Sequence, residues 1–395
     1  MLKNVYVAGG VRTPFGSFTG ALSTLSAPQL GSLSIRATLE RTGVKPDQID
    51  EVLFGNVIQA GLGQNPARQA ALGAGLPPSC GATTINKVCG SALRTVILAA
   101  QSIQCGDAHL IMTGGCESMS NAPYLLRKAR TGYRLGHGEL VDAMIYDGLW
   151  DVYSNRHMAT CGDQCAVKYG FSREEQDTYS IESYTRAIRA WDDGFYKGGV
   201  IPVEIKSKKG STLVERDEDV SKFQGAEKLR ALQPAFGPES MVTAGNASGI
   251  NDGAASMLVF DDEARTRYGI KPAARILGHA NAALEPDWFT IAPIYAIKKL
   301  CEQLKIRPTE VDFFEINEAF AVVAIVAIRE LGLDPAKVNV AGGAVAIGHP
   351  IGATGARIVN TLIRAMEKMN KRLGIACLCI GGGEASAIAL ERTTQ

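Results

Sequence analysis

The chain has 395 residues, and its 41 lysines and arginines nearly balance its 40 aspartates and glutamates, which leaves a formal charge of +1. This balance excludes a nucleic-acid binder that depends on overall positive charge. Hydrophobic residues make up 46% and charged residues 21% of the chain, as in ordinary globular proteins. A chain of this length exceeds what one hydrophobic core supports, so we expect at least two packed units. No apolar run approaches about 18 residues, so we expect no membrane-spanning helix.

The nine cysteines are odd in number and irregularly spaced. They include one Cys-x3-Cys pair, Cys161 with Cys165, and one Cys-x-Cys pair, Cys377 with Cys379. A secreted disulfide framework would be shorter and denser in cysteine, and zinc sites usually carry repeated close pairs. The first residues also lack the apolar stretch of a signal peptide. We therefore expect reduced thiols in a cytoplasmic protein and no metal site.

Short apolar runs alternate with segments of helical periodicity, which predicts an α/β fold. Several of the runs are apolar on both faces, as expected of parallel strands covered by helices. The predicted strands are Val5–Ala8, Glu51–Val57, Leu110–Gly114, Ala255–Phe260, Phe313–Ile316, Lys337–Ala341 and Ile375–Ile380. The predicted helices are Gln29–Arg41, Ser91–Gln104, Pro293–Leu304, Glu318–Leu331 and Gly352–Lys371.

A similar pattern occurs near the start of each half of the chain. One apolar strand lies within Asp50–Asn56 and another within Asp312–Asn317. Each is followed 32 or 33 residues later by a reactive side chain in a glycine-rich turn, Cys89 in the first half and His349 in the second. We therefore expect an internal duplication, with chance similarity as the alternative.

The stretch from residue 121 to 243 interrupts the alternation of strands and helices. It is polar and aromatic, contains a charged helix predicted over Ser172–Asp193, and is rich in Lys and Glu near 206–230. We interpret it as a loop domain inserted between the last strands of the first half; a set of long surface loops is the alternative. The expected division is residues 1–120 with 244–268 for the N-terminal half, 121–243 for the insertion and 269–395 for the C-terminal half.

Cys89 is the first candidate for chemistry. It stands between a strand-like run and the helix predicted from Ser91, with Gly90 in between. This order places the thiol at a helix N-terminus, where free N–H groups and the helix dipole favour the thiolate. A buried cysteine that packs like alanine is the alternative.

His349 is the second candidate, because it lies between Gly348 and Pro350 where another predicted helix opens. Glycine permits close approach of the backbone, and proline suits a first helical turn. A core histidine needs no such frame, and neither a Walker A nor a dinucleotide-binding pattern fits. We therefore expect a catalytic base at this position.

Two more candidates follow predicted strands at the sheet edge where open α/β folds bind ligands. Cys379 nearly ends the run Ile375–Ile380 before three glycines, whereas Cys377 on the same face is interpreted as a core residue. Asn317 follows the strand Phe313–Ile316. The alternative role of Asn317 is that of an ordinary helix cap.

These residues belong to a series of motifs that resembles the thiolase family, most closely its acetyl-CoA acetyltransferases, over essentially the whole chain. The motifs are Val11–Gly16, Gly63–Gln69, Ile85–Ser91, Asn121–Tyr124, Thr243–Gly249, Asn317–Phe320, Gly348–Pro350 and Cys379–Gly383. The resemblance implies two duplicated halves with mixed five-stranded sheets, in a layered α-β-α-β-α arrangement plus the inserted loop domain. It also implies the reversible Claisen condensation of two acetyl-CoA molecules to acetoacetyl-CoA and CoA, or the reverse thiolysis.

The resemblance also implies a role for each candidate. Cys89 is the nucleophile that carries the acetyl group, and His349 is the base that activates it. Cys379 is the acid/base that moves the α-proton of acetyl-CoA. Asn317, through a bound water, joins His349 in stabilising an enolate, while the backbone N–H groups of Cys89 and Gly381 stabilise the tetrahedral oxyanion.

Coenzyme A and acetyl-CoA are expected as substrates, with no tightly bound cofactor. By resemblance, Ser248 contacts the pantetheine arm, while His157 and Met158 lie near the thioester. The residues expected to form apolar walls are Leu149, Phe236, Ala244 and Phe320. The basic residues near 206–230 are expected to face the nucleotide phosphates; an ordinary solvated surface is the alternative. Thiolases form dimers or dimers of dimers, and the stretch near 120–145 favours a homotetramer.

Two other interpretations remain. A broader 3-ketoacyl-CoA thiolase of fatty-acid breakdown would use the same chemistry in a deeper pocket. A non-catalytic thiolase-like acyl-CoA binding protein would lack part of the set Cys89, Asn317, His349 and Cys379, all of which are present.

The chain departs from the family pattern at two positions near these motifs. Glu384 follows the third glycine, where many members have a small or neutral residue. Ala159 follows Met158, where glycine is common in short-chain members. These departures leave the acyl chain length open, and the sequence does not fix the direction of the reaction in the cell.

Overall fold

Ten strands form one mixed sheet in the computed structural model of this protein, which describes residues 3–208 and 210–393. Their order is β14-β15-β16-β13-β1-β12-β5-β3-β4, and the short β2 pairs with β12. The strands of the first half are β1 Tyr6–Arg12, β2 Gly16–Ser17, β3 Glu51–Gly55, β4 Gly81–Ile85, β5 Leu110–Ser118 and β12 Asn251–Phe260. Those of the second half are β13 Ala274–Ala283, β14 Phe313–Ile316, β15 Leu373–Ile380 and β16 Glu384–Arg392.

The sheet is continuous across the two halves because β1 and β13 pair antiparallel. Tyr6 lies opposite Arg275, and Val7 lies opposite Ala274. The resemblance implied a mixed five-stranded sheet in each half, and this junction joins the strands of both halves into one sheet. The α/β class and the mixed strand directions are confirmed, with parallel pairs between β3 and β5 and between β14 and β15.

The prediction of a strand over Lys337–Ala341 is wrong. Residues from Pro335 form a 3-10 turn, and Val338 makes only an isolated bridge to Phe314. Asn339 has φ +51°, and its side-chain amide takes the place of strand pairing by bonding both the N–H and the C=O of Ile316, at 2.9 and 2.8 Å. Within the described residues, the C-terminal half therefore supplies four strands instead of five.

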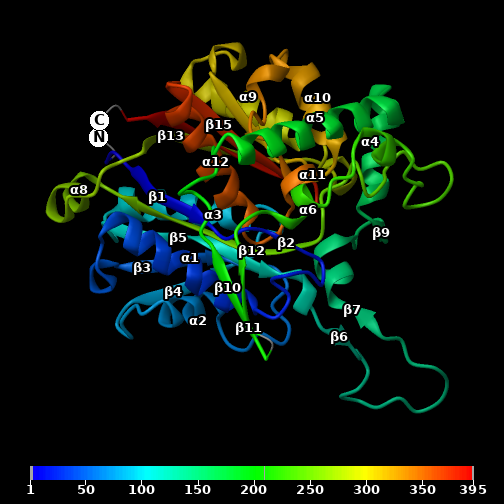
Figure 1. The fold of residues 1–395 in the computed structure, drawn as a ribbon, viewed down its shortest axis with the longest axis horizontal. Helices are drawn as coiled ribbons and strands as arrows, with labels where there is room; N and C mark the ends of the chain where they lie inside the picture. Colours follow the sequence, from blue (N-terminus) through cyan, green and yellow to red (C-terminus); the bar gives the residue numbers. More distant parts are fainter. Residues whose placement is uncertain (1–2, 209, 394–395) are drawn as a thin grey trace.

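Helices cover the sheet in layers (Figure 1). α1 (Ala27–Thr42) and α2 (Pro66–Gly73) pack together on the outer face of the first half, where α1 contacts β1, β5 and β12. α9 (Ala292–Leu304) contacts β13, β15 and β16 on the outer face of the second half, and α10 (Ala321–Leu331) packs beside α9. These helices form the two outer layers of the expected α-β-α-β-α arrangement, and two further helices form its central layer.

The central layer consists of α3 (Ser91–Cys105) and α12 (Thr354–Lys368), which contact each other between the two halves. Their backbones approach closely because Gly355 has no side chain. A Cβ there would lie 2.1 Å from the Leu93 backbone nitrogen. The N-terminal ends of the two helices therefore meet at the centre of the molecule, just after Cys89 and His349 in the sequence.

The two halves repeat one local arrangement. The carboxylate of Asp50 accepts hydrogen bonds from both backbone N–H groups of residues 109–110, at 2.7 and 2.9 Å. The carboxylate of Asp312 accepts the same two bonds from residues 372–373, at 3.0 and 2.9 Å. In each half the bonds tie the start of one strand to its parallel neighbour, and this likeness supports the duplication expected from the sequence.

The segment 121–243 is an excursion between two neighbouring strands. β5 and β12 pair antiparallel from Ser118 with Asp252 to Leu110 with Phe260, so the chain leaves and re-enters the sheet at adjacent positions. The elements of the excursion are the hairpins β6 Tyr124–Leu125 with β7 Val141–Asp142, β8 Trp150–Asp151 with β9 Arg156–His157 and β10 Val203–Ser207 with β11 Gly210–Val214, the π-helix Met144–Leu149, and the helices α4 Ala159–Tyr169, α5 Arg173–Asp192, α6 Glu218–Ser221 and α7 Ala226–Arg230. Outside it lie α8 Asp262–Tyr268 and α11 Ala344–Ile347.

α5 confirms the charged helix predicted from the sequence to within one residue at each end. Its start is fixed by a capping box: the Glu175 N–H donates to the Ser172 Oγ at 3.1 Å, and the Glu175 carboxylate accepts from the Ser172 N–H at 2.7 Å. Among the described residues, every helix is too short or too polar to span a lipid bilayer.

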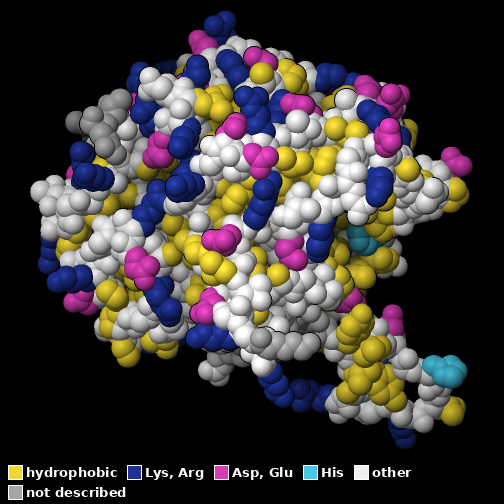
Figure 2. Space-filling model, in the orientation of Figure 1, with side chains coloured by type: hydrophobic (Ala, Val, Ile, Leu, Met, Phe, Trp, Pro, Cys, Tyr) yellow, Lys and Arg dark blue, Asp and Glu magenta, His cyan; other side chains and the backbone are white. Residues whose placement is uncertain are grey.

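The chain between β6 and β7 extends away from the rest of the molecule (Figure 1). Figure 2 shows hydrophobic side chains gathered on this projection. Leu126, Tyr133, Leu135 and Leu140 are exposed there. Several large apolar side chains in one exposed segment are typical of a surface that contacts another protein.

Candidate active site

Cys89 lies in a tight turn between β4 and α3. Val88 before it has φ +46°, a conformation that β-branched residues rarely adopt. Ser91 closes the turn, because its Oγ accepts from the Lys87 N–H at 2.8 Å and donates to the Val88 C=O at 2.7 Å. The strained backbone holds Cys89 at the N-terminus of α3, where the sequence predicted it.

Burial has the largest effect on the pKa of the Cys89 thiol. It raises the pKa of the thiol to about 11, although the backbone N–H groups of Gly381 and of Cys89 itself lower the pKa. The nearby carboxylate of Glu117 raises it further. Desolvation therefore opposes the preference for a thiolate that we expect from a helix N-terminus. A base that accepts the thiol proton would offset this effect of burial.

His349 lies in the turn between α11 and α12 and is held from several sides. Its backbone N–H donates to the Asn251 Oδ1 at 2.8 Å, and its ring Nδ1 lies 2.7 Å from the Thr354 Oγ1. Since the Thr354 hydroxyl donates to the Pro350 C=O at 2.9 Å, we assign the ring proton to Nδ1 and the lone pair to Nε2. Burial, and then the charge of Arg357, lower the pKa of His349 to about 3. The ring is neutral, with Nε2 available as a base.

Asn317 is not the helix cap considered as an alternative. α10 begins at Ala321, and the extended residue Phe320 precedes it. The Asn317 Oδ1 instead accepts from the Arg357 Nη2 at 3.0 Å, and its Nδ2 lies 3.5 Å from the His349 Nε2. Asn317 and His349 therefore form one site, although they come from different loops.

Cys379 is the penultimate residue of β15 and is buried close to Cys89. Burial raises the pKa of its thiol well above the ordinary value, and a charge on Cys89 raises it further, whereas the Ala319 N–H lowers it. Cys377 is also buried, with its Sγ 3.9 Å from the Pro293 C=O, as expected of a core residue. The two candidate thiols thus meet, while the third stays in the core.

The turn Gly381–Gly383 brings backbone to these thiols. Gly382 and Gly383 have φ +88° and +89°, which favours glycine. A Cβ at Gly381 would lie 2.8 Å from the Met158 Cε. The backbone N–H of Gly381 bonds the Cys89 sulfur.

Four residues expected on the acyl side lie together beside this turn. The Met158 N–H donates to the Leu149 C=O at 3.0 Å, and the His157 ring stacks on Phe236 with 4.4 Å between centroids. Burial lowers the pKa of His157. A hollow of about 560 Å³ is lined by Met158 and Gly381. Val88, the residue before Cys89, also lines it, so the hollow offers room for a ligand beside the Cys89 turn.

Ser248 and Phe320 are brought together by backbone pairing. The Ser248 N–H donates to the Ala319 C=O at 3.0 Å, and Ala247 forms an antiparallel bridge with Phe320. Phe320 is buried, and its ring centroid lies 6.4 Å from that of Phe289. The loop that carries Ser248 is therefore fixed to the loop that carries Asn317.

Ala244 lines a different hollow, of about 300 Å³. Lys222 and Lys228 line the same hollow. They are the members of the basic segment 206–230 that face it, and Lys209 of that segment lies outside the described residues. Ala244 therefore lies beside two basic residues of that segment.

Sequence reasoning missed the buried polar residues that hold the site. These are Asn251, Glu315, Glu318, Thr354 and Arg357. A signal was present for two of them. Glu315 interrupts an otherwise apolar strand, and Arg357 interrupts the apolar face of a helix; a charge in such a place needs a partner.

One group of side chains of metal-ligand type occurs in the described part of the chain. Ligand atoms of Asp151, Cys161 and Asp287 lie within 4.8 Å of one another. Arg156 already supplies a positive charge there, with its Nη2 2.9 Å from the Asp287 Oδ1. We therefore propose no metal site at these three residues.

An ion pair joins the two turns that carry the thiols. The Lys87 Nζ contacts the Glu384 carboxylate, and both side chains are partly exposed. Lys87 lies two residues before Cys89, and Glu384 begins β16 directly after the glycine turn. The acidic residue that departs from the family pattern thus links the Cys89 turn to the Gly381 turn.

If Cys89 is the nucleophile that the resemblance implies, replacing Glu384 by Gln is expected to slow its acetylation by up to about 10-fold, because the two turns lose their link and misplaced groups react slowly. Thermal stability should change little, since partly exposed ion pairs contribute little. The rate of CoA exchange into acetyl-CoA measures the effect.

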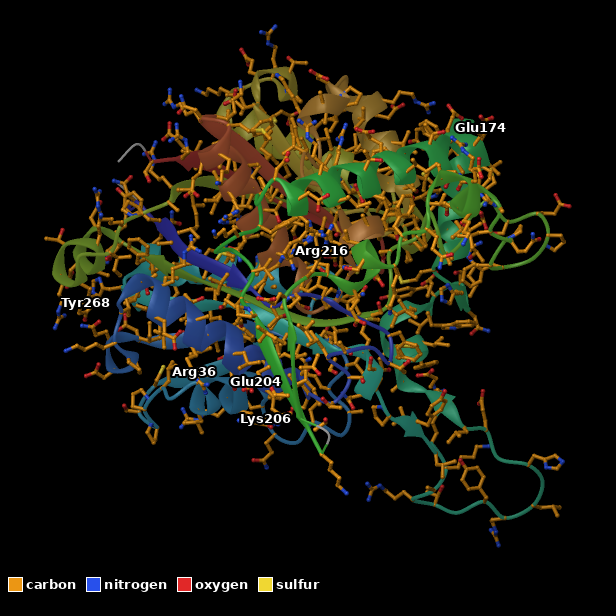
Figure 3. All side chains as sticks on the ribbon, viewed as in Figure 1. Arg36, Glu174, Glu204, Lys206, Arg216 and Tyr268 are labelled. Atoms are coloured by element: carbon orange, nitrogen blue, oxygen red, sulfur yellow. The ribbon has the colours of Figure 1, made fainter. Side chains whose placement is uncertain are left out.

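The charge-reversed pair Lys87→Glu with Glu384→Lys should restore most of the exchange rate. Glu204→Gln is the matched control, because Glu204 pairs with Lys206 at 3.8 Å on the β10–β11 hairpin (Figure 3). An unchanged exchange rate in Glu384→Gln would show that the link is not needed.

Family models for thiolases match nearly the whole chain. The model described as the N-terminal domain of thiolase matches residues 5–263, and the model described as the C-terminal domain of thiolase matches residues 270–392. The chain therefore belongs to the thiolase family, as its motifs indicated.

Similar proteins carry a more particular name. The chain is 49% identical over 392 residues to acetyl-CoA acetyltransferase 2 of Arabidopsis thaliana, which covers 98% of this chain and 97% of the relative. It is 46% identical over 393 residues to the acetyl-CoA acetyltransferase of Allochromatium vinosum, which covers 99% of this chain and 100% of the relative.

Two solved structures share the fold. The Acat5 thiolase from Ascaris suum in complex with coenzyme A superposes with a TM-score of 0.93 at 42% identity, over 99% of this chain and 100% of that one. The acetyl-CoA acetyltransferase of Bacillus anthracis superposes with a TM-score of 0.96 at 38% identity, over 99% of each chain. The thiolase fold expected from the sequence is confirmed.

Proposed function

We propose that this chain is an acetyl-CoA acetyltransferase that interconverts two molecules of acetyl-CoA with acetoacetyl-CoA and CoA. The observation that carries the proposal is the meeting of Cys89, Cys379 and the Gly381 N–H in one buried place, with two glycine-framed turns around them. The names of the relatives and the CoA-bound structure of a similar thiolase support the substrate.

The first half-reaction transfers an acetyl group to Cys89. The sulfur attacks the thioester carbon as His349 Nε2 accepts the thiol proton, and the N–H groups of Cys89 and Gly381 stabilise the oxyanion. The attack forms the acetyl–Cys89 bond. Collapse of the tetrahedral intermediate re-forms the carbonyl and breaks the bond to the CoA sulfur, which takes up the proton of the Cys379 thiol and leaves. The high pKa of the Cys89 thiol requires proton transfer and attack to be closely coupled.

The second half-reaction forms the carbon–carbon bond. Cys379, as the thiolate left by the first half-reaction, removes an α-proton from a second acetyl-CoA, while His349 and Asn317 face the enolate oxygen, Asn317 through a water. The enolate carbon attacks the acetyl group on Cys89, and the Cys89 sulfur leaves with the proton that His349 took from it. Thiolysis is the same path in reverse.

The packing around Cys379 favours a short acyl group. Phe289 and Phe320 belong to the same buried cluster as Cys379 and Met158, so aromatic rings fill the interior on this side. A long acyl chain would have to displace them, and overpacking a filled core is unfavourable.

The protein is therefore expected to cleave acetoacetyl-CoA with a kcat/KM about 10- to 100-fold above that for 3-ketooctanoyl-CoA, since added methylenes find no space. Rates of thiolysis of the two substrates check this, and Phe289→Ala should narrow the difference. Equal efficiency on both would instead favour the broader 3-ketoacyl-CoA thiolase.

We also propose that the insertion 121–243 helps to hold coenzyme A; it interrupts the N-terminal half, 1–120 with 244–268, and the C-terminal half is 269–395. Ser248, His157 and Phe236 would contact the pantetheine arm, and Ala244 would contact the far end of the cofactor. Lys222 and Lys228 would then meet the phosphates, because they line the hollow beside Ala244.

The exposed apolar side chains between β6 and β7 support a homotetramer in which this projection contacts another subunit. The cytoplasm is the proposed location, in keeping with the nine cysteines, all of which are free.

A further inference from the structure

Arg357 is the largest fully buried side chain among the described residues, and its surroundings are unusual for a core position. It lies on α12, and its Nη1 donates to the Glu315 Oε2 of β14 at 3.1 Å. The buried pair is poorly satisfied, because the Arg357 Nε and the Glu315 Oε1 have no hydrogen-bond partner. Burial raises the pKa of Glu315 against the opposing charge of Arg357. Such a pair is an inefficient way to stabilise a core.

The second donor of Arg357 reaches the proposed site. Its Nη2 donates to the Asn317 Oδ1 at 3.0 Å, and the Asn317 Nδ2 lies 3.5 Å from the His349 Nε2. His349 is held in turn by Thr354 at 2.7 Å. A continuous buried chain of polar contacts thus runs from β14 through α12 to the imidazole.

This chain fixes which end of the Asn317 amide faces His349. A guanidinium only donates, so the amide must offer its oxygen to Arg357 and its NH₂ to the site. Without Arg357, a half-turn of the amide would place an oxygen against the Nε2 lone pair. The same charge lowers the pKa of His349 and favours a neutral ring.

We infer that Arg357, held by Glu315, is a positioning residue for carbon–carbon bond formation: it orients Asn317 toward the enolate oxygen. The inference rests on the proposed function and adds to it, since neither side chain touches substrate. Acetyl transfer to Cys89 does not use Asn317, so the two half-reactions should respond differently.

The test replaces the ion pair by an apolar pair, Glu315→Met with Arg357→Met. Methionine fills irregular space, and an apolar pair of similar volume often preserves the stability of a core. We expect cooperative thermal unfolding, exchange of CoA into acetyl-CoA within about 3-fold of wild type, and condensation slowed about 100-fold in kcat with KM little changed.

Arg357→Lys serves if the double variant does not fold. It keeps the charge beside Glu315, but one ammonium cannot donate to both Glu315 and Asn317 in the same way. Condensation should fall by about 10-fold or more while exchange is retained. Arg12→Met with Asp217→Met is the matched control, because that pair is also buried, at 2.7 Å, and contacts neither Asn317 nor His349.

The outcomes separate the two levels of the proposal. A wild-type protein that neither exchanges CoA nor condenses acetyl-CoA overturns the proposed function and this inference with it. If the wild type is active, then condensation at the wild-type rate in a folded variant overturns the inference alone. Equal loss of both half-reactions, or the same selective loss in the control pair, also overturns it.

Discussion

Replacing Cys89 by alanine is expected to abolish acetylation of the protein and to lower thiolysis of acetoacetyl-CoA by about 10⁴-fold or more. The reason is that Cys89 is the proposed nucleophile, whereas Cys379 has the separate role of acid and base. Intact mass before and after incubation with acetyl-CoA shows the addition of one acetyl group per chain in the wild type. The variant should show none.

Cys377→Ala is the matched control for this experiment. Cys377 is a buried thiol that packs in the core of the C-terminal half, so its loss should leave acetylation intact. A Cys89→Ala protein that retains full thiolysis would rule out the mechanism. A wild-type protein that never becomes acetylated would favour the non-catalytic acyl-CoA binding protein.

Replacing Cys379 by serine is expected to permit acetylation of Cys89 yet slow condensation by about 10²- to 10⁴-fold. Serine has nearly the shape of cysteine, but its hydroxyl is a far weaker acid and cannot take the α-proton at neutral pH. Intact mass measures the first half-reaction, and formation of acetoacetyl-CoA measures the second.

The role of Cys379 is judged from the ratio of the condensation rate to the acetylation rate. Burial and the nearby Cys89 raise the pKa of its thiol, so only a site that holds the substrate α-carbon against it makes proton transfer efficient. Loss of acetylation in Cys379→Ser would remove the division of labour between the two thiols. Exchange of the acetyl α-protons with solvent should fall along with condensation.

The sequence pattern predicted those helices and strands that are determined by their own residues. The strand Phe313–Ile316 was placed at both ends, and α5 was placed within one residue because Ser172 caps it. β13 and β16 were missed, because they are rich in alanine and small polar residues. Their pairing with each other and with distant β1 makes them strands.

The candidate site divides in the same way. Cys89, His349 and Cys379 were predicted because glycines lie beside them in the sequence. Such glycines let the backbone approach a substrate closely. The hydrogen bond from His349 to Asn251 joins residues far apart in the chain, and no local pattern announces it. The raised pKa of Cys89 could not be predicted either, since desolvation belongs to the finished fold.

The place of β1 at the middle of the sheet bears on how the protein is made. Its two neighbours are β12 and β13, which begin at Asn251 and Ala274, so the first strand to leave the ribosome waits for partners synthesised much later. Pairing over such separations raises contact order and slows folding. Until residue 283 has emerged, β1 keeps open edges and the first half is prone to aggregate. A chaperone that binds nascent chains would therefore meet this protein with its N-terminal strand still unpaired.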